Sequence, residues 1–185
     1  MTRDQVLDVI AAAWADAAPP AAGDLAGRDD DCGEYGYVAE FFRDRTWRDV
    51  DLAALEDYPG PHYACLSFMS GAAFRHFLAS YMTMALTDPL DPCVDATQFA
   101  LTPPVYEAAL DELARAHGSD TCSAETVGRQ RRWWEQRVVG FTSTQIDAIV
   151  AFLECLRSAY GDADVAPALE WWRRTALAVG SLRHD

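Results

Sequence analysis

The stretch "CLSFMSGAAFRHFLASYMTMAL", residues 65–86, decides the fold class of this chain. Its apolar residues recur every three or four positions, which is the period of one face of an α-helix. They are Phe74, Phe77, Leu78, Tyr81, Met82 and Ala85. Ser70 comes just before this run and is a residue type that favours a helix N-cap. The pattern therefore predicts a buried helix over residues 71–87.

The same period appears along most of the chain, and Pro- and Gly-rich stretches such as "YPGPHY", "TDPLDP" and "LTPP" separate the periodic runs. No run alternates as a half-buried strand does. We predict helices near residues 3–17, 34–44, 51–57, 71–87, 93–100, 104–116, 124–139, 143–159 and 166–179. The fold class is thus all-α, with residues 1–185 as a single compact irregular domain of about eight or nine helices.

One shared core should hold the largest side chains of the periodic faces. The residues that we expect there are Trp14, Phe74, Phe77, Leu78, Tyr81, Ile149, Val150 and Leu153. Helix-start signals support the assignment, because Thr142 followed by Gln145 has the form of a capping box. Gly161 is expected to end the last of these helical runs, "IDAIVAFLECLRSAYG".

The charge of the chain narrows the classes of partner. Its 185 residues carry 15 Lys plus Arg against 29 Asp plus Glu, which gives a formal net charge of -14. Such a charge repels nucleic-acid phosphates and anionic lipids and favours a basic protein partner. Duplex DNA and membranes are therefore not expected as partners. The first residues lack a signal-peptide pattern and no apolar run is long enough to span a membrane, so we expect a cytoplasmic protein.

The five cysteines are odd in number and far apart, and no CxxC pair occurs. They are Cys32, Cys65, Cys93, Cys122 and Cys155. We expect free thiols, since a chain without a secretion signal stays in a reducing compartment. The four histidines are equally scattered and show no metal-binding spacing. No metal or other cofactor is predicted from this spacing.

The stretch "GRDDDCGEYGYVAEFF", residues 27–42, places four carboxylates around Cys32. A calcium loop of the EF-hand type needs its acidic residues at alternate positions, and this order fails that test. We interpret the stretch as a helix start that is capped by Asp31 or a neighbour. The surplus carboxylates should be largely exposed and form part of a binding surface for a basic partner. The candidate binding residues are Asp29, Asp30, Asp31 and Glu34.

Tryptophan and arginine occur together in "RQRRWWEQR", residues 129–137, and in "EWWRR", residues 170–174. This combination can stack on single-stranded bases or anchor a protein interface, but paired tryptophans in a helix also belong to cores. We expect one core residue and one half-buried neighbour in each pair. Any exposed ring is a candidate for a protein-binding hot spot. The candidate binding residues here are Arg132, Trp133, Trp171 and Arg174.

A catalytic role is the alternative hypothesis. His76 could act as a general base if Cys65, Ser67 or Ser70 lay beside it in space, and Cys32 is a further candidate centre. Arg75, next to His76, is expected to pair with a carboxylate from another helix. Because no nucleophile elbow, Gly-rich phosphate loop or metal spacing accompanies these residues, no catalytic residue is predicted. A metal-dependent or cysteine/histidine hydrolase remains the alternative.

The stretch at 65–86 resembles the "LTPEAFRYYLPAYL" core helix of an uncharacterised family of small, acidic bacterial proteins. Other landmarks of that family are "VAEFFRDRTWRDVDLAAL" from Val38, "FALTPP" from Phe99, "FTSTQIDAIVAFLECL" from Phe141 and "ALEWWRR" from Ala168. The resemblance covers most of the chain, but its motifs are helix caps and core aromatics and imply no chemistry. Together with the charge, it leads us to expect a non-catalytic acidic binding protein, such as an immunity protein or inhibitor that docks on a basic partner.

Overall fold

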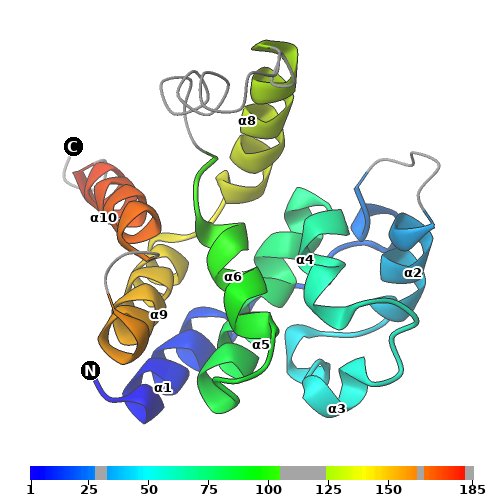
Figure 1. The fold of residues 1–185 in the computed structure, drawn as a ribbon, viewed down its shortest axis with the longest axis horizontal. Coiled ribbons are helices and arrows are strands. Elements are labelled where there is room, and N and C mark those ends of the chain that lie inside the picture. The colour runs from blue at the N-terminus through cyan, green and yellow to red at the C-terminus, as the bar shows by residue number, and fades with distance from the viewer. Residues whose placement is uncertain (28–32, 105–123, 162–164, 182–185) are drawn as a thin grey trace, which may run out of the picture.

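Helix α5 (Gly71–Thr87) lies at the centre of the structure, a computed structural model that describes residues 1–27, 33–104, 124–161 and 165–181. Ser70 begins the helix, because its hydroxyl oxygen accepts a hydrogen bond from the Ala73 amide at 3.1 Å. Phe74, Phe77 and Tyr81 are fully buried. Figure 1 shows the other helices arranged around α5. The predicted helix at 71–87 is confirmed with both of its ends.

The described residues form nine α-helices and no β-strand, which confirms the all-α class. Besides α5 these are α1 (Arg3–Ala13), α2 (Glu34–Phe41), α3 (Leu52–Leu55), α4 (Cys65–Phe68), α6 (Cys93–Leu101), α8 (Ala124–Val138), α9 (Ser143–Tyr160) and α10 (Ala166–Ser181). Three short 3-10 helices are η1 (Ala22–Asp24), η2 (Trp47–Asp49) and η3 (His62–Ala64). Most of the helix predicted at 104–116 lies outside the described residues.

Helices α1, α6 and α8 and the short helix η2 pack against α5, and α9 packs against both α1 and α10. Figure 1 shows α1, α9 and α10 on one side of the molecule and α2 and α3 on the other. Tryptophan side chains tie these elements together through main-chain carbonyls. Trp14 Nε1 donates to the Arg75 carbonyl at 2.7 Å, and Trp172 Nε1 donates to the Leu101 carbonyl at 2.9 Å.

The predicted core is confirmed as one continuous cluster. Seven of its eight members are buried, and Val150 is partly buried against the others. Removal of such side chains from water stabilises the fold by on the order of 1.5–3 kcal/mol each. This cluster holds α1, α5 and α9 together and fixes the position of the surface helices α8 and α10.

The caps of α9 follow the prediction. Thr142 and Gln145 form the capping box of α9, and Gly161 ends that helix with a positive φ of 100°. The N-cap of α2 is Gly33, which has no side chain that could make a capping hydrogen bond. Asp31, the expected cap, lies outside the described residues.

No single helix among the described residues has both the length and the apolar character that a membrane crossing requires. The segments 131–138 and 143–159 meet those criteria only as a pair, and the chain bends by 114° between them. Ile149 and Leu153 of the second segment are buried inside the protein.

Candidate functional site

The two tryptophan pairs lie on neighbouring helices, α8 and α10. Trp134 and Trp172 are buried, whereas Trp133 is 37% exposed and Trp171 is half-buried. Each pair therefore contributes one core residue and one residue that reaches the surface, as we expected. Trp133 and Trp171, both predicted binding residues, are the members that solvent can reach.

The indole rings form an edge-to-face cluster. The ring centroids of Trp134 and Trp171 are 4.3 Å apart, and those of Trp171 and Trp172 are 4.8 Å apart. Phe141, just before α9, extends the cluster, since its ring centroid is 5.6 Å from that of Trp172. Aromatic pairs in this geometry stabilise a contact by about 0.5–1.5 kcal/mol beyond burial. The cluster therefore fixes α8 against α10.

A cavity of about 380 Å³ opens beside this cluster, between α8 and α10, and we name it the tryptophan pocket. Its size lies within the range of small ligand sites. The walls that matter most are apolar and come from Trp134, Val138, Phe141, Ile146, Trp171 and Val179. Arg131 and Glu135 supply a polar edge, and their side chains pair with each other at 2.9 Å.

Arg137 is a buried cation directly beside this site, only 2% exposed. Its Nη2 donates to the main-chain carbonyls of Ser67 at 2.7 Å and Met69 at 3.0 Å. Its guanidinium carbon lies 3.6 Å from the ring centroid of Trp133 and 5.0 Å from that of Phe74. Its Nε and Nη1 make no hydrogen bond. Burial lowers the pKa of Arg137 to about 9, so the group is still charged at neutral pH.

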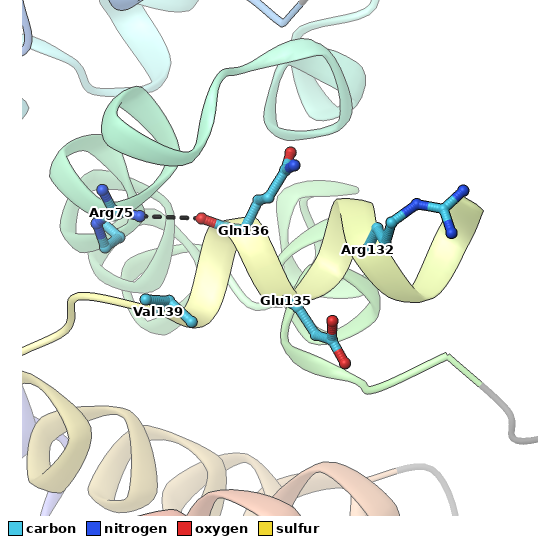
Figure 2. A pocket seen from close by; sticks show the side chains of 5 residues that line it. All are labelled: Arg75, Arg132, Glu135, Gln136 and Val139. Carbon is cyan, nitrogen blue, oxygen red and sulfur yellow. Dashed lines mark hydrogen bonds between the residues drawn. The ribbon is translucent and has the colours of Figure 1, made fainter. Parts of the chain in front are cut away.

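A second cavity, of about 460 Å³, adjoins the tryptophan pocket on α8, because Glu135 and Val139 line both. Figure 2 shows its lining, with Arg75 at one end and Arg132 at the other. Arg75 Nη1 donates to the carbonyl oxygens of Gln136 at 3.1 Å and Arg137 at 3.4 Å. The prediction that Arg75 pairs with a carboxylate is therefore wrong, because its guanidinium group binds main-chain carbonyls at the end of α8. Arg132, a predicted binding residue, is exposed at the rim.

The remaining predicted binding residues do not join this site. Arg174 is exposed and pairs with Glu170, one turn away on α10. Glu34 is partly buried, and its Oε2 accepts a hydrogen bond from the Tyr58 hydroxyl at 3.3 Å. The expectation that Glu34 is largely exposed is therefore wrong. Asp29, Asp30 and Asp31 lie outside the described residues.

In the described part of the chain, no hydrogen bond joins His76 to Cys65, Ser67 or Ser70, and Cys32 lies outside that part. His76 is buried, and its Nε2 accepts a hydrogen bond from the Trp47 amide at 3.0 Å, which occupies the lone pair that a base would use. Burial lowers the pKa of His76. Burial also raises the pKa of the Cys65 thiol to about 11, and its hydrogen-bonding neighbours are Tyr81 and Tyr58. A thiol of this kind is not activated at neutral pH.

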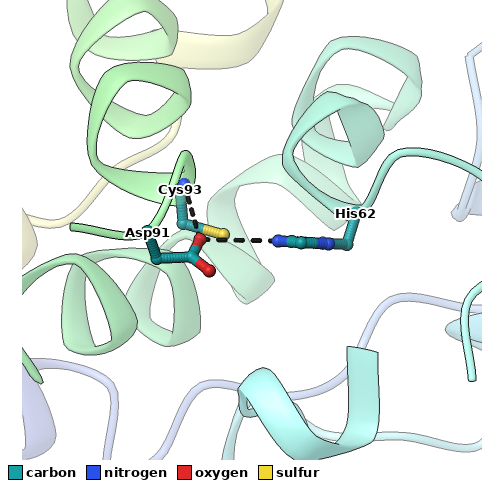
Figure 3. A group of neighbouring side chains, drawn as sticks. All are labelled: His62, Asp91 and Cys93. Atoms are coloured by element: carbon teal, nitrogen blue, oxygen red, sulfur yellow. Dashed lines mark hydrogen bonds and ion pairs between the residues drawn. The ribbon is translucent and has the colours of Figure 1, made fainter. Parts of the chain in front are cut away.

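Three potential metal ligands meet elsewhere in the fold, at His62, Asp91 and Cys93. One ligand atom from each lies within 4.8 Å of the other two. Figure 3 shows the three side chains from close by. This group was not predicted, because His62 and Cys93 lie far apart in the sequence and Asp91 was not among the expected ligands. The sequence feature that could have indicated this group is the order Asp91-Pro92-Cys93, which places a carboxylate and a thiol at the start of a helix.

Cys155, Cys65 and Cys93 are free thiols, as predicted, and Cys32 and Cys122 lie outside the described residues. Burial, together with the neighbouring Asp91 carboxylate, raises the pKa of the Cys93 thiol well above its usual range. Hydrogen bonds from Cys93 and His62 lower the pKa of Asp91 and outweigh the opposing effect of burial.

Comparison with known proteins places the chain in a family. Residues 2–176 match the model of a family described as "Family of unknown function (DUF6714)". Among curated proteins and among solved structures, no match to the chain was found. The matched range includes both tryptophan pairs and all three residues of the group at His62. The chain therefore belongs to this family of unknown function, which confirms that it is a member of an uncharacterised family.

Proposed function

We propose that this chain is a non-catalytic cytoplasmic binding protein that docks on a basic protein partner, in the manner of an immunity protein or inhibitor. The observation that carries the proposal is the tryptophan pocket, a cavity of about 380 Å³ whose apolar walls include Trp134 and Trp171. Trp and Arg dominate the hot spots of protein interfaces. In this chain both residue types lie on one pair of surface helices.

The surroundings of the pocket favour an interface. Val139, just after α8, and Leu177 on α10 are 69% and 75% exposed, and Trp133 adds a partly exposed indole on α8. Apolar side chains that are left in water next to a pocket are typical of a docking surface. The edge-to-face cluster holds the rings in place before binding, so little conformational entropy is lost when a partner docks.

Charge indicates what kind of side chain the pocket receives. The chain carries a formal net charge of -14, which attracts basic proteins and speeds their encounter with it. Aromatic rings attract a Lys ammonium or Arg guanidinium group. At the pocket edge such a cation meets Glu135, where it competes with Arg131 for the carboxylate. We therefore propose that an Arg or Lys side chain of the partner enters the tryptophan pocket.

The hydrolase alternative has less support. Two of the three described thiols, those of Cys65 and Cys93, have raised pKa values, the reverse of what a nucleophile beside His76 needs. A binding role needs no such group.

The test starts with affinity purification of the partner from the native host and continues with calorimetry on the purified pair. Trp171→Ala should weaken binding by about 30-fold or more, as loss of an interface hot spot does. Tyr37→Ala is the matched control, because Tyr37 is an exposed aromatic residue on α2, and it should change the affinity by less than about threefold. Circular dichroism should show that both variants fold.

Salt dependence tests the charge argument separately. The association rate should fall as ionic strength rises, and Asp29→Asn with Asp30→Asn should slow association at low salt without unfolding the chain. Equal affinity of Trp171→Ala and the unmodified chain would exclude the tryptophan pocket as the docking site. An association rate that does not respond to salt would exclude the basic partner.

A further inference from the structure

The group formed by His62, Asp91 and Cys93 joins two parts of the chain that the sequence separates by 29 residues. His62 begins η3, directly after the turn "YPGP", and Cys93 is the first residue of α6. Figure 3 shows the imidazole edge, the carboxylate and the thiol directed toward one another. Imidazole nitrogen, carboxylate oxygen and thiolate sulfur are the three donor types that zinc sites use.

The distances fit a shared cation better than a direct ion pair. His62 Nε2 lies 3.4 Å from Asp91 Oδ1, which is long for a charge-assisted hydrogen bond of about 2.7–2.9 Å. Zinc bonds of about 2.0–2.3 Å at tetrahedral angles place two ligand atoms about 3.3–3.8 Å apart. All the ligand atoms of this group lie within 4.8 Å of one another, so small side-chain rotations reach that geometry.

Neighbouring groups hold the ligands in place. The Tyr81 hydroxyl donates to the His62 carbonyl at 2.9 Å, and this fixes η3 against the central helix. The Cys93 amide donates to Asp91 Oδ1 at 2.7 Å, and this hydrogen bond orients the carboxylate. Outer partners of this kind orient metal ligands and support metal affinity.

Access and selectivity also favour zinc. The side chains of His62 and Asp91 are 33% and 17% exposed, whereas Cys93 is fully buried, so an ion can enter from solvent and meet a thiol at the inner end. Calcium and magnesium prefer oxygen ligands alone, and a thiol with an imidazole selects a softer ion.

We propose that His62 Nε2, the Asp91 carboxylate and Cys93 Sγ bind one Zn²⁺ ion, with a fourth position open to water. The ion joins η3 to the start of α6 and so cross-links two proline-rich connections, "YPGPHY" and "TDPLDP". On binding, the Cys93 thiol gives up its proton to solvent, because thiolate is the form that binds metal. Bound ion stabilises the folded chain in proportion to its affinity and concentration.

The test is a titration of the full chain, stripped of metal by a chelator, with Co²⁺ as a spectroscopic probe. We expect one Co²⁺ per chain, a near-ultraviolet thiolate-to-cobalt band, loss of the band on addition of Zn²⁺, and a higher melting temperature with Zn²⁺. Asp91→Asn and His62→Gln should each weaken binding by at least about 100-fold, the upper end of the effect of losing an outer-shell partner. Cys93→Ser should abolish the thiolate band.

Two matched controls separate the site from adventitious binding. Asp95→Asn removes an exposed carboxylate from the first turn of the same helix, and Cys155→Ser removes a free thiol from α9; both should bind Co²⁺ as the unmodified chain does. A band that survives in Cys93→Ser, or equal affinity in Asp91→Asn and Asp95→Asn, overturns the proposal. Absence of saturable Co²⁺ binding overturns it too. Should Cys93→Ser fail to fold, His62→Gln decides, because His62 is at the surface.

Discussion

The guanidinium carbon of Arg137 lies 3.6 Å from the ring centroid of Trp133, so a fully buried cation supports a partly exposed indole. The same guanidinium holds two carbonyls of the α4 region, those of Ser67 and Met69. Arg137 therefore links the surface of α8 to the chain just before α5. The position of Trp133, a candidate hot spot, depends on a side chain that solvent does not reach.

Replacement of Arg137 should destabilise the fold. Arg137→Ala leaves a cavity and deprives two carbonyls of their donor, so the free energy of unfolding should fall by about 2–4 kcal/mol. Arg137→Met keeps most of the side-chain volume, so it should lower the free energy of unfolding by less than Arg137→Ala does. Urea denaturation measures both. Arg132→Ala, an exposed change on the same helix, should alter stability by no more than about 0.5 kcal/mol. Similar values for Arg137→Ala and Arg132→Ala would contradict this role.

Gly71, the first residue of α5, lies directly against the main chain of α8 at Gln136. A Cβ at this position would overlap the Gln136 carbonyl oxygen, a backbone atom, and lie 3.2 Å from Arg75 Nη1. Gly71→Ala should therefore force the helices apart and destabilise the fold by about 1–3 kcal/mol in thermal or urea unfolding.

Gly36 offers the matched control inside α2, because a Cβ there meets nothing within 4 Å. Gly36→Ala should stabilise the fold by about 0.5–1 kcal/mol, as removal of a mid-helix glycine does. Equal effects of the two changes would show that the contact between Gly71 and α8 is absent in solution.

Much of the fold could be predicted because its helices are long and amphipathic. For α5, residues 71–87, and α9, residues 143–160, the apolar period indicated a helix and the capping residues indicated where it begins and ends. Helix α4, at Cys65–Phe68, and the three 3-10 helices were not predicted, since each is too short to show a period. Packing of the surrounding chain determines them.

Only those features of the candidate sites that depend on neighbouring residues in the sequence could be predicted. Tryptophan pairs on a helix must divide between core and surface, so Trp133 and Trp134 followed the expectation. The partner of Arg75 could not be predicted, because the carbonyls that it caps lie 61 and 62 residues further along the chain. The meeting of His62 with Cys93 likewise depends on how η3 packs on α6.

The three described thiols should differ in reactivity. Cys155 is half-buried, whereas burial raises the pKa of Cys65 to about 11 and also raises that of Cys93. Because the thiolate is the reactive form, iodoacetamide at neutral pH should modify Cys155 first and leave the other two until the chain unfolds. Peptide mass spectrometry after timed quenching measures the order. Modification of Cys65 as fast as Cys155 in the folded chain would contradict the packing of α4.

His76 should make stability depend on pH. Burial is the main cause that lowers its pKa in the folded chain, with Arg48 adding a smaller effect in the same direction and the Ala18 backbone opposing both. The unfolded chain, with a pKa of about 6.5, therefore takes up a proton before the folded chain does. Since the unfolded state binds more protons in this window, the free energy of unfolding should fall as the pH drops below about 6.5, down to the folded pKa.

Replacement of this side chain isolates its contribution. In His76→Gln the amide oxygen still accepts a hydrogen bond but the side chain at this position does not titrate, so the curve of stability against pH should flatten below about pH 6.5. Depressed carboxyl pKa values at Asp49 and Asp91 act in a separate window, because their stabilisation is lost only as the pH falls below about 4. Urea denaturation at a series of pH values checks both windows. An unchanged slope just below pH 6.5 in His76→Gln would mean that His76 is not the group that titrates.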